Sequence, residues 1–274
     1  MTIGEALKDE QRRLGLNNKQ MAGNIMSQAT YSKVINEKQI LNSEALVQLL
    51  LFHDIDVEDF FEKLKETYIS SRKDCIDKIR KQMFIEANTG NLKEVQLLIT
   101  KLKELELSDS ELFHDYLIVA DLTKNLDKLD SKIKNQIINK IKNDSNWINN
   151  LPALRLFATS LVILSSELIE EKMSFFFFKI SRMKKISEHM LERYAMLCDN
   201  YLHWKFDKRE VKNINVQNAL SFLYELPDVP HFMIYRISEK YYRKLFDGEI
   251  LDARKIKVEL LKLGSKTGIN NWPQ

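Results

Sequence analysis

The sequence of 274 residues has little glycine, proline or cysteine, with 7 Gly, 4 Pro and 2 Cys. Scarce glycine and proline beside 44% apolar residues exclude collagen-like, disordered and linker-rich classes. Cys75 and Cys198 are far apart and have no second thiol or histidine at ligand spacing, so we expect neither a disulfide framework nor a zinc site. No apolar run is long enough to span a bilayer, and the N-terminus lacks an apolar signal region. These absences predict a cytoplasmic protein with no membrane partner.

Charge of one sign is also absent, because 42 basic residues face 39 acidic ones. Any contact with nucleic acid must therefore come from a local patch. The five histidines are dispersed, and no glycine-rich phosphate loop or hydrolase motif occurs. The adjacent pairs His114–Asp115 and Glu188–His189 are typical of solvated helix surface. We expect no enzyme, no cofactor and no metal site.

What the sequence does contain is helical periodicity, with apolar residues recurring at three and four, so the predicted fold is all-α. Five short helices are expected at 3–14, 18–26, 28–35, 43–51 and 57–66. After Tyr68 the units lengthen to about two helices per 35 to 40 residues, which predicts a tetratricopeptide-like solenoid of about five helix pairs. Breaks are expected near 88–91, 108–109, 143–150, 208–213, 227–230 and 247–248. The predicted domains are residues 1–66 and 67–274.

Residues 15–35 fit a helix-turn-helix, in which a second helix presents its N-terminal residues to base edges in the major groove. Asn17 and Ser27 are suited to cap its two helices. On the second helix Tyr31 can pack inward, while Gln28 and Lys33 share the outward face and are the types that bond purine edges. These two are the predicted base readers.

The stretch IGEALKDEQRRLGLNNKQMAGNIMSQATYSKVINEKQILNSEALVQLLLFHDIDVEDFF resembles the helix-turn-helix of the Rgg family of Gram-positive regulators. The family run S-Q-x-T-x-S-[RK] is present at 27–33, and its element I-x-x-x-[ED]-F is present at 55–60. Weaker likenesses follow at Trp147 with Leu156–Phe157 and at YYRKLFDGEI. The chain departs from the family pattern at Gln11, at Asn18 and at 35–37.

The resemblance and the helix faces together give the expected contacts with double-stranded DNA. The phosphate contacts are expected from Lys8, Arg12 or Arg13, Lys19 and Asn36, since residues 1–40 carry six basic and four acidic groups. So few contacts require a two-fold homodimer on repeated half-sites. Tyr31 is weighed chiefly as a packing residue. The full set of expected DNA-binding residues is Lys8, Arg12, Asn18, Lys19, Ser27, Gln28, Ala29, Thr30, Tyr31, Lys33 and Asn36.

Rgg-like proteins are regulated by short apolar signalling peptides, as in quorum sensing, so the resemblance implies a peptide groove on the concave face of the repeats. Arg155 could bind a peptide carboxylate there, or it could reach solvent or pair with Glu167 or Glu170. The apolar run Phe175–Phe178 predicts a helix buried on two sides, either between repeats, which is favoured, or at a dimer interface. The expected peptide-binding residues are Trp147, Arg155, Thr159, Tyr194, Asn200, Tyr201, Asn218, Phe222 and Tyr235, any of which could instead be a repeat-packing residue.

The interpretation is a dimeric, peptide-responsive transcription regulator. Two alternatives stay open: a helical-repeat scaffold or adaptor that binds protein partners, and a DNA-binding regulator whose repeats serve only a peptide-independent dimerisation. We expect the dimer contacts mainly in residues 68–274, because the short N-terminal module should lack surplus apolar surface.

Overall fold

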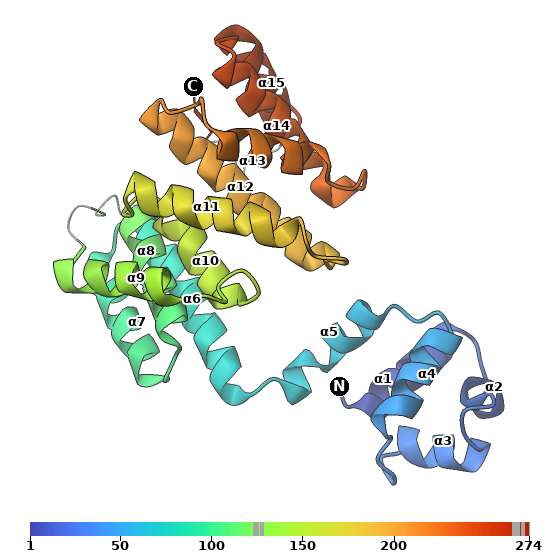
Figure 1. The fold of residues 1–274 in the computed structure, drawn as a ribbon. Coiled ribbons are helices and arrows are strands. Elements are labelled where there is room, and N and C mark those ends of the chain that lie inside the picture. Colours follow the sequence, from blue (N-terminus) through green and yellow to red (C-terminus); the bar gives the residue numbers. More distant parts are fainter. Residues whose placement is uncertain (123–125, 127–128, 265–268, 270–271, 274) are drawn as a thin grey trace. The chain divides into compact units, whose positions relative to one another are not determined.

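The computed structural model describes residues 1–274 except 123–125, 127–128, 265–268, 270–271 and 274, and leaves the side chain of Asn88 undescribed. Every regular element in the described part is a helix, so the all-α prediction is confirmed (Figure 1). The chain divides into two compact units, Met1–Lys78 and Ile79–Gln274. The predicted domain boundary at 66/67 lies inside a helix of the first unit.

The first unit holds five short helices: α1 (Ile3–Arg13), α2 (Asn18–Ala22), α3 (Gln28–Ile35), α4 (Ser43–Phe52) and α5 (Val57–Tyr68). Asn17 and Ser27 cap α2 and α3 as predicted, since their side chains accept from the amides of Gln20 and Thr30. Helix α2 ends sooner than expected because Gly23 turns the chain with a φ of 52°.

The core of the first unit is closed by side chains from all five helices, among them Leu7, Met21, Tyr31, Leu49 and Phe60, each fully buried. Helix α1 packs directly on the backbone of α3. A Cβ atom on Gly4 would lie 2.5 Å from the carbonyl oxygen of Val34, so only glycine allows this approach.

A buried carboxylate ties α1 to α5. Glu10 is only 1% exposed, and its oxygens accept from Lys63 at 2.7 Å and from Arg13 at 2.7 Å. Burial opposes ionisation of Glu10, but these hydrogen bonds outweigh it and lower its pKa. The acceptor is therefore charged at neutral pH and fixes the position of α5.

The second unit continues from α6 (Ser71–Thr89), which runs across the division at residue 78. Its other helices are α7 (Leu92–Glu104), α8 (Asp109–Leu122), α9 (Ser131–Asn143), α10 (Leu151–Ser160), α11 (Ser166–Ile180), α12 (Glu188–Lys208), α13 (Ile214–Tyr224), η2 (Pro230–Phe232), α14 (Met233–Phe246) and α15 (Ile250–Lys262). Each predicted break lies at or beside a loop or turn between helices, and several of the ranges include a helix end.

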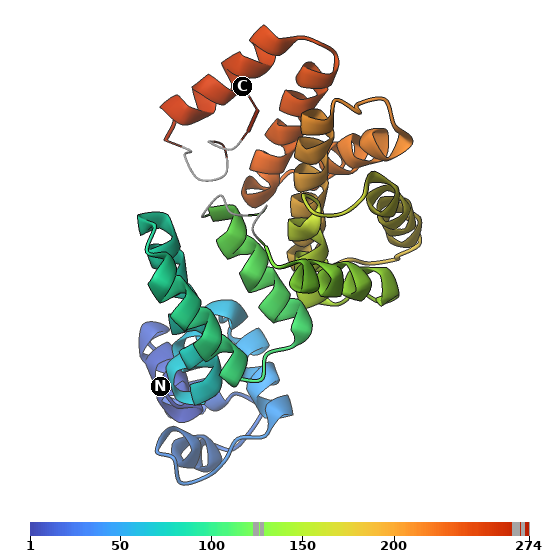
Figure 2. The same ribbon diagram turned by 90° about the vertical axis from the view of Figure 1, so that its left-hand side faces the viewer.

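Along the second unit, corresponding helices of neighbouring helix pairs pack against each other. Helix α8 contacts α10, α10 contacts α12, and α12 contacts α14, while α11 contacts α13 (Figures 1 and 2). This repeated stacking is the arrangement of a helical-repeat solenoid.

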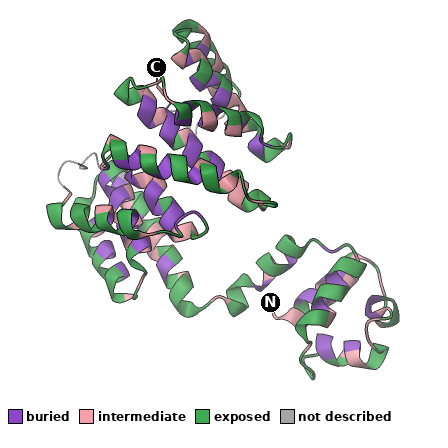
Figure 3. Cartoon of the chain, viewed as in Figure 1, coloured by how far each residue is buried: buried purple, intermediate pink, exposed green. Residues whose placement is uncertain are grey.

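Aromatic side chains fill the core between the stacked helices, where buried residues gather in Figure 3. The rings of Trp147 and Phe157 lie 4.7 Å apart, and those of Phe176 and Tyr194 lie 5.2 Å apart. The favoured prediction, that the 175–178 helix is buried on both sides between repeats, is wrong, because Phe178 is 49% exposed within the single chain; burial at a dimer interface stays a prediction. A run of four consecutive aromatics places some of its side chains on the solvent face of a helix with one buried stripe.

Candidate functional site

Helix α3 presents a polar face to solvent in the first unit. Gln28, Ala29 and Lys33 are exposed, while Val34 and Ile35 are buried in the core of this unit. The two predicted base readers are therefore both accessible to solvent, which base contact requires.

The turn that sets α3 is held by side-chain hydrogen bonds. Ser27 Oγ lies 2.9 Å from Thr30 Oγ1, and Gln11 donates to Asn18 Oδ1 at 2.9 Å. Asn36 donates to the carbonyl of Ser32 at 2.7 Å. These polar residues already stabilise the motif, and they have capacity left for phosphate contacts.

The basic residues expected at phosphates are accessible. Arg12, Lys19 and Lys33 are exposed and Lys8 is half-buried. Within the described part of the chain, no carboxylate lies within ion-pair distance of these four. Their charges remain available for a polyanion.

Tyr31 is a packing residue, as chiefly predicted, which removes it from the expected DNA-binding set. Its side chain is fully buried, and its hydroxyl donates to the carbonyl of Leu7 at 3.3 Å. Burial raises its pKa well above the usual range. Tyr31 fixes α3 against α1 and cannot reach DNA in this structure.

In the second unit, an arginine from α6 binds a carboxylate of α8. Arg80 Nε lies 3.0 Å from Asp115 Oδ1 and its Nη2 lies 2.9 Å from Oδ2, a bidentate pair in which Asp115 is nearly buried. Burial raises the pKa of Asp115 against the opposing effect of Arg80. The prediction that His114–Asp115 is solvated helix surface is therefore wrong.

His114 lies beside this pair. Its Nδ1 is 3.2 Å from Thr159 Oγ1 of α10. Burial, together with the charges of Arg155 and Arg80, lowers the pKa of His114 to about 4. The imidazole is therefore neutral at pH 7.

Arg155 of α10 has no carboxylate partner within ion-pair distance among the described residues. Glu170 is instead held by Lys205 at 2.7 Å, and the exposed Glu167 caps its own helix end, so the two alternative pairings are excluded. Burial and the nearby charge of Arg193 lower the pKa of Arg155. Arg155 is exposed, so its guanidinium reaches solvent, which is the remaining alternative that the sequence left open.

A further unpaired cation lies on α12. Arg193 Nε is buried and has no hydrogen-bond acceptor among the described residues. On the same helix Asn200 is exposed and donates to the carbonyl of Ala158 at 3.3 Å. Tyr235 of α14 is half-buried, and its pKa is raised to about 12 by burial and by Glu192. We call the surface formed by Arg80, His114, Arg155, Thr159, Arg193, Asn200 and Tyr235 the arginine face.

Beside Arg155 the arginine face is hollowed by a cavity of about 290 Å³. Six of its eleven lining residues are apolar, and the others are two arginines, two carboxylates and His114. Its lining is Arg80, Met83, Phe84, Glu111, His114, Asp115, Ile118, Val119, Leu151, Pro152 and Arg155. Such a site suits an apolar group that ends in a carboxylate.

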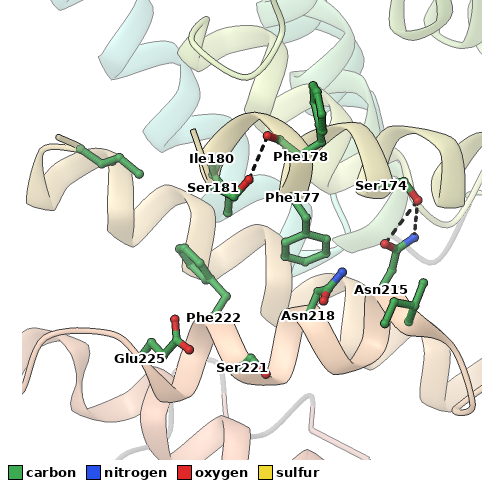
Figure 4. Close-up of a pocket in the computed structure, with 12 residues that line it drawn as sticks. Ser174, Phe177, Phe178, Ile180, Ser181, Asn215, Asn218, Ser221, Phe222 and Glu225 are labelled. Carbon is green, nitrogen blue, oxygen red and sulfur yellow. Dashed lines mark hydrogen bonds between the residues drawn. The ribbon is translucent and has the colours of Figure 1, made fainter. Parts of the chain in front are cut away.

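Two of the expected peptide residues lie in another pocket, of about 660 Å³, between α11 and α13 (Figure 4). Asn218 and Phe222 project from α13 toward Phe177 of α11. None of its lining residues is shared with the cavity beside Arg155. The expected groove residues are therefore divided between two places.

Three expected groove residues are packing residues. The side chains of Trp147, Tyr194 and Tyr201 are 2% exposed or less. The hydroxyl of Tyr194 donates to the carbonyl of Ile148, and that of Tyr201 donates to Glu170. They stabilise the repeat core, which corrects their assignment to an open groove.

Sequence reasoning missed Arg80, His114 and Arg193 as members of the arginine face. One signal was present: Asp115, Arg155 and Arg193 recur at about the repeat length of 35 to 40 residues, so they occupy related positions in successive pairs. Aligning the repeats on charged positions would have grouped them.

Two searches of the described residues found nothing. No group of histidine, cysteine or carboxylate side chains there could hold a metal ion. None of the helices described is both long and apolar enough to cross a membrane.

No protein-family model and no curated protein matches the sequence. Solved structures match nearly the whole chain. A putative transcriptional regulator from Listeria monocytogenes EGD-e has a TM-score of 0.73 at 14% identity, covering 98% of this chain and 93% of that one. The SHP pheromone receptor Rgg2 of Streptococcus dysgalactiae has a TM-score of 0.68 at 10% identity, covering 96% and 94%.

The receptor of a bacterial peptide pheromone/receptor complex has a TM-score of 0.71 at 16% identity, covering 96% of this chain and 92% of that one. The chain therefore has the all-helical fold of the pheromone-receptor regulators. The resemblance to the Rgg family, first drawn from residues 3–61, is confirmed at the level of the fold.

Proposed function

We propose that this chain is a DNA-binding transcription regulator, not an enzyme, controlled by a short apolar peptide that binds the arginine face. The peptide-binding residues in this proposal are Arg155, Thr159, Asn200 and Tyr235. The DNA-binding residues are the exposed groups of α3, with Lys8, Arg12 and Lys19. The active form is a homodimer in the cytoplasm.

One observation carries the peptide part: the solvent-exposed guanidinium of Arg155 has no carboxylate within ion-pair distance among the described residues, and it borders a cavity with mostly apolar walls. Such a guanidinium can bind a ligand carboxylate without first giving up a partner in the protein. The fold shared with pheromone receptors supports the same conclusion.

Asn200 and Thr159 suit the peptide backbone. The Asn200 amide keeps a second donor and its oxygen after bonding to the carbonyl of Ala158. A short peptide must offset its ordering entropy through such backbone bonds and through apolar burial.

The proposal is tested by calorimetric titration of the full chain with the short apolar peptides encoded beside its gene. Each peptide is used as the free acid and as the C-terminal amide. A charge-assisted hydrogen bond contributes roughly 1.5 to 3 kcal/mol, so the free acid should bind about 10- to 100-fold more tightly. Arg155→Gln should abolish that preference.

Arg254→Gln is the matched control, because Arg254 is an exposed arginine on α15. It should keep the preference for the free acid. If neither the C-terminal amide nor Arg155→Gln changes the affinity, the peptide binds elsewhere. The pocket between α11 and α13 would then be tested next, with Asn218→Ala. Absence of any binding would favour a scaffold or a peptide-independent dimerisation domain.

A further inference from the structure

Helix α5 carries an apolar seam that the core of its own unit leaves uncovered. Val57, Phe61, Leu64 and Tyr68 follow one another at spacings of four, three and four, the spacing of alternating d and a positions in a heptad. Val57, Phe61 and Tyr68 are 44%, 50% and 57% exposed, and Leu64 is buried beneath them. Much of α5 is exposed in Figure 3.

A groove of about 900 Å³ runs along this seam within the first unit. Ile3 and Ile69 add apolar walls, and Lys73 and Asp77 lie at its edge. The hydroxyl of Tyr68 accepts from the amide of Ile3 at 3.4 Å, which ties the groove to the start of α1. The expectation that the N-terminal module lacks surplus apolar surface is therefore wrong.

The charges beside the seam identify what covers it. With Leu64 at a d position, Glu58 and Lys65 both fall at e, seven residues apart. In an antiparallel pair of identical helices, e faces e of the partner, so each Glu58 would meet the Lys65 of the other copy. In a parallel pair e faces g of the partner, so Lys65 would meet the apolar Phe60 and neither charge would gain an opposite partner.

Lys65 can change its partner. It now forms an ion pair with Glu62 on the same helix, and both side chains are about 60% exposed. An exposed pair of this kind contributes little stability, so exchange for an intermolecular partner costs little.

We propose that the α5 seam packs antiparallel against the α5 seam of a second copy of this chain, about a two-fold axis near Phe61 and Leu64. The inference rests on the proposed function, since one helix-turn-helix module offers too few phosphate contacts and needs a second at a fixed spacing. Helix α5 has 12 residues and spans about 18 Å, too short for a stable interface alone. It acts within a dimer held elsewhere or assembled on DNA.

Cross-linking of the full chain tests the proposal. In a Cys75→Ser background, which removes the exposed thiol and leaves the buried Cys198, Phe61→Cys is treated with a short bis-maleimide. Covalent dimer should form rapidly. The matched control is Asn24→Cys, an exposed position in the turn before α3, which should cross-link at least about tenfold more slowly. Circular dichroism melting verifies that both variants fold.

Charge reversal identifies the pairing. Glu58→Lys and Lys65→Glu should each slow the Phe61→Cys cross-link by about fivefold, and the double reversal should restore it. Equal rates for Phe61→Cys and Asn24→Cys, or a double reversal no faster than the slower single, would overturn the α5 pairing. A chain that binds peptide and DNA as a dimer but shows either result loses only this inference. A chain that sediments as a monomer with DNA present loses both.

Discussion

His114 of α8 donates a hydrogen bond from its Nδ1 to the hydroxyl oxygen of Thr159 on α10, and these two atoms lie 3.2 Å apart. The Thr159 hydroxyl fixes the direction of this bond, because its own hydrogen points to the carbonyls of Arg155 at 3.0 Å and Leu156 at 3.1 Å. A neutral imidazole therefore lies between two arginines, Arg80 and Arg155, and protonating it would place three cations together.

This arrangement predicts a loss of stability in mild acid. Below pH 6.5 the unfolded chain takes up a proton that native His114 refuses until about pH 4, so the free energy of unfolding falls as pH drops through that window. His114→Gln should remove up to about 3 kcal/mol of this dependence. The free energy of unfolding of the native protein and of His114→Gln is measured by urea melts at pH 7, 5.5 and 4.5. Asp115 is present in both proteins, so its own titration does not distinguish them. Stability that falls equally with pH in both proteins would contradict the prediction.

How far the sequence predicts this protein differs between its two units. The helix-turn-helix follows from local signals, and the structure keeps the caps at Asn17 and Ser27 and the inward packing of Val34. Each of these signals depends on residues only three or four positions apart in the sequence. Sequence alone therefore locates α3 and its exposed face.

The repeat unit is harder, because a helix stacked between neighbours can bury more than one stripe. Periodicity gave the breaks but not which Tyr or Trp faces outward, so Tyr194 and Tyr201 were placed in a groove although they lie in the core. The Arg80–Asp115 pair joins residues 35 positions apart, and no local rule connects them.

The close approach of α1 and α3 predicts a sharp packing defect. Gly4→Ala would press its Cβ against the carbonyl oxygen of Val34, which belongs to backbone and cannot move aside cheaply. We expect a loss of about 1 to 3 kcal/mol in the free energy of unfolding, measured by thermal and urea melts. Gln48→Ala, on the exposed face of α4, should change stability by less than about 0.5 kcal/mol. An unchanged melt for Gly4→Ala would mean that α1 and α3 lie further apart.

The outward face of α3 predicts a separation of specific from general DNA binding. Gln28→Ala and Lys33→Ala should each weaken binding to the site selected from a random duplex library by about 1 to 3 kcal/mol, with non-specific affinity nearly intact. Lys8→Ala should instead lower affinity for every duplex and reduce the salt dependence. Footprints that survive both α3 substitutions would show that another element reads the bases.

The buried lysine of α12 predicts a strong effect at a distance from both sites. Lys205 is 1% exposed and pairs with Glu170 at 2.7 Å and Glu210 at 3.0 Å. Glu170→Ala should cost about 3 to 5 kcal/mol of stability, because the remaining charge is buried and poorly compensated. Glu167→Ala, about one turn earlier on the exposed face of α11, should leave the melting temperature nearly unchanged. Equal melting temperatures for the two variants would contradict this account of the core.

The most direct test of the central claim is the DNA affinity of the full chain with and without a peptide that it binds. If the peptide changes the affinity for DNA, linkage requires that DNA change the affinity for the peptide by the same factor. The account predicts a change of about fivefold or more at saturating peptide, lost in Arg155→Gln and retained in Arg254→Gln. An operator affinity identical with and without bound peptide would contradict peptide control of DNA binding.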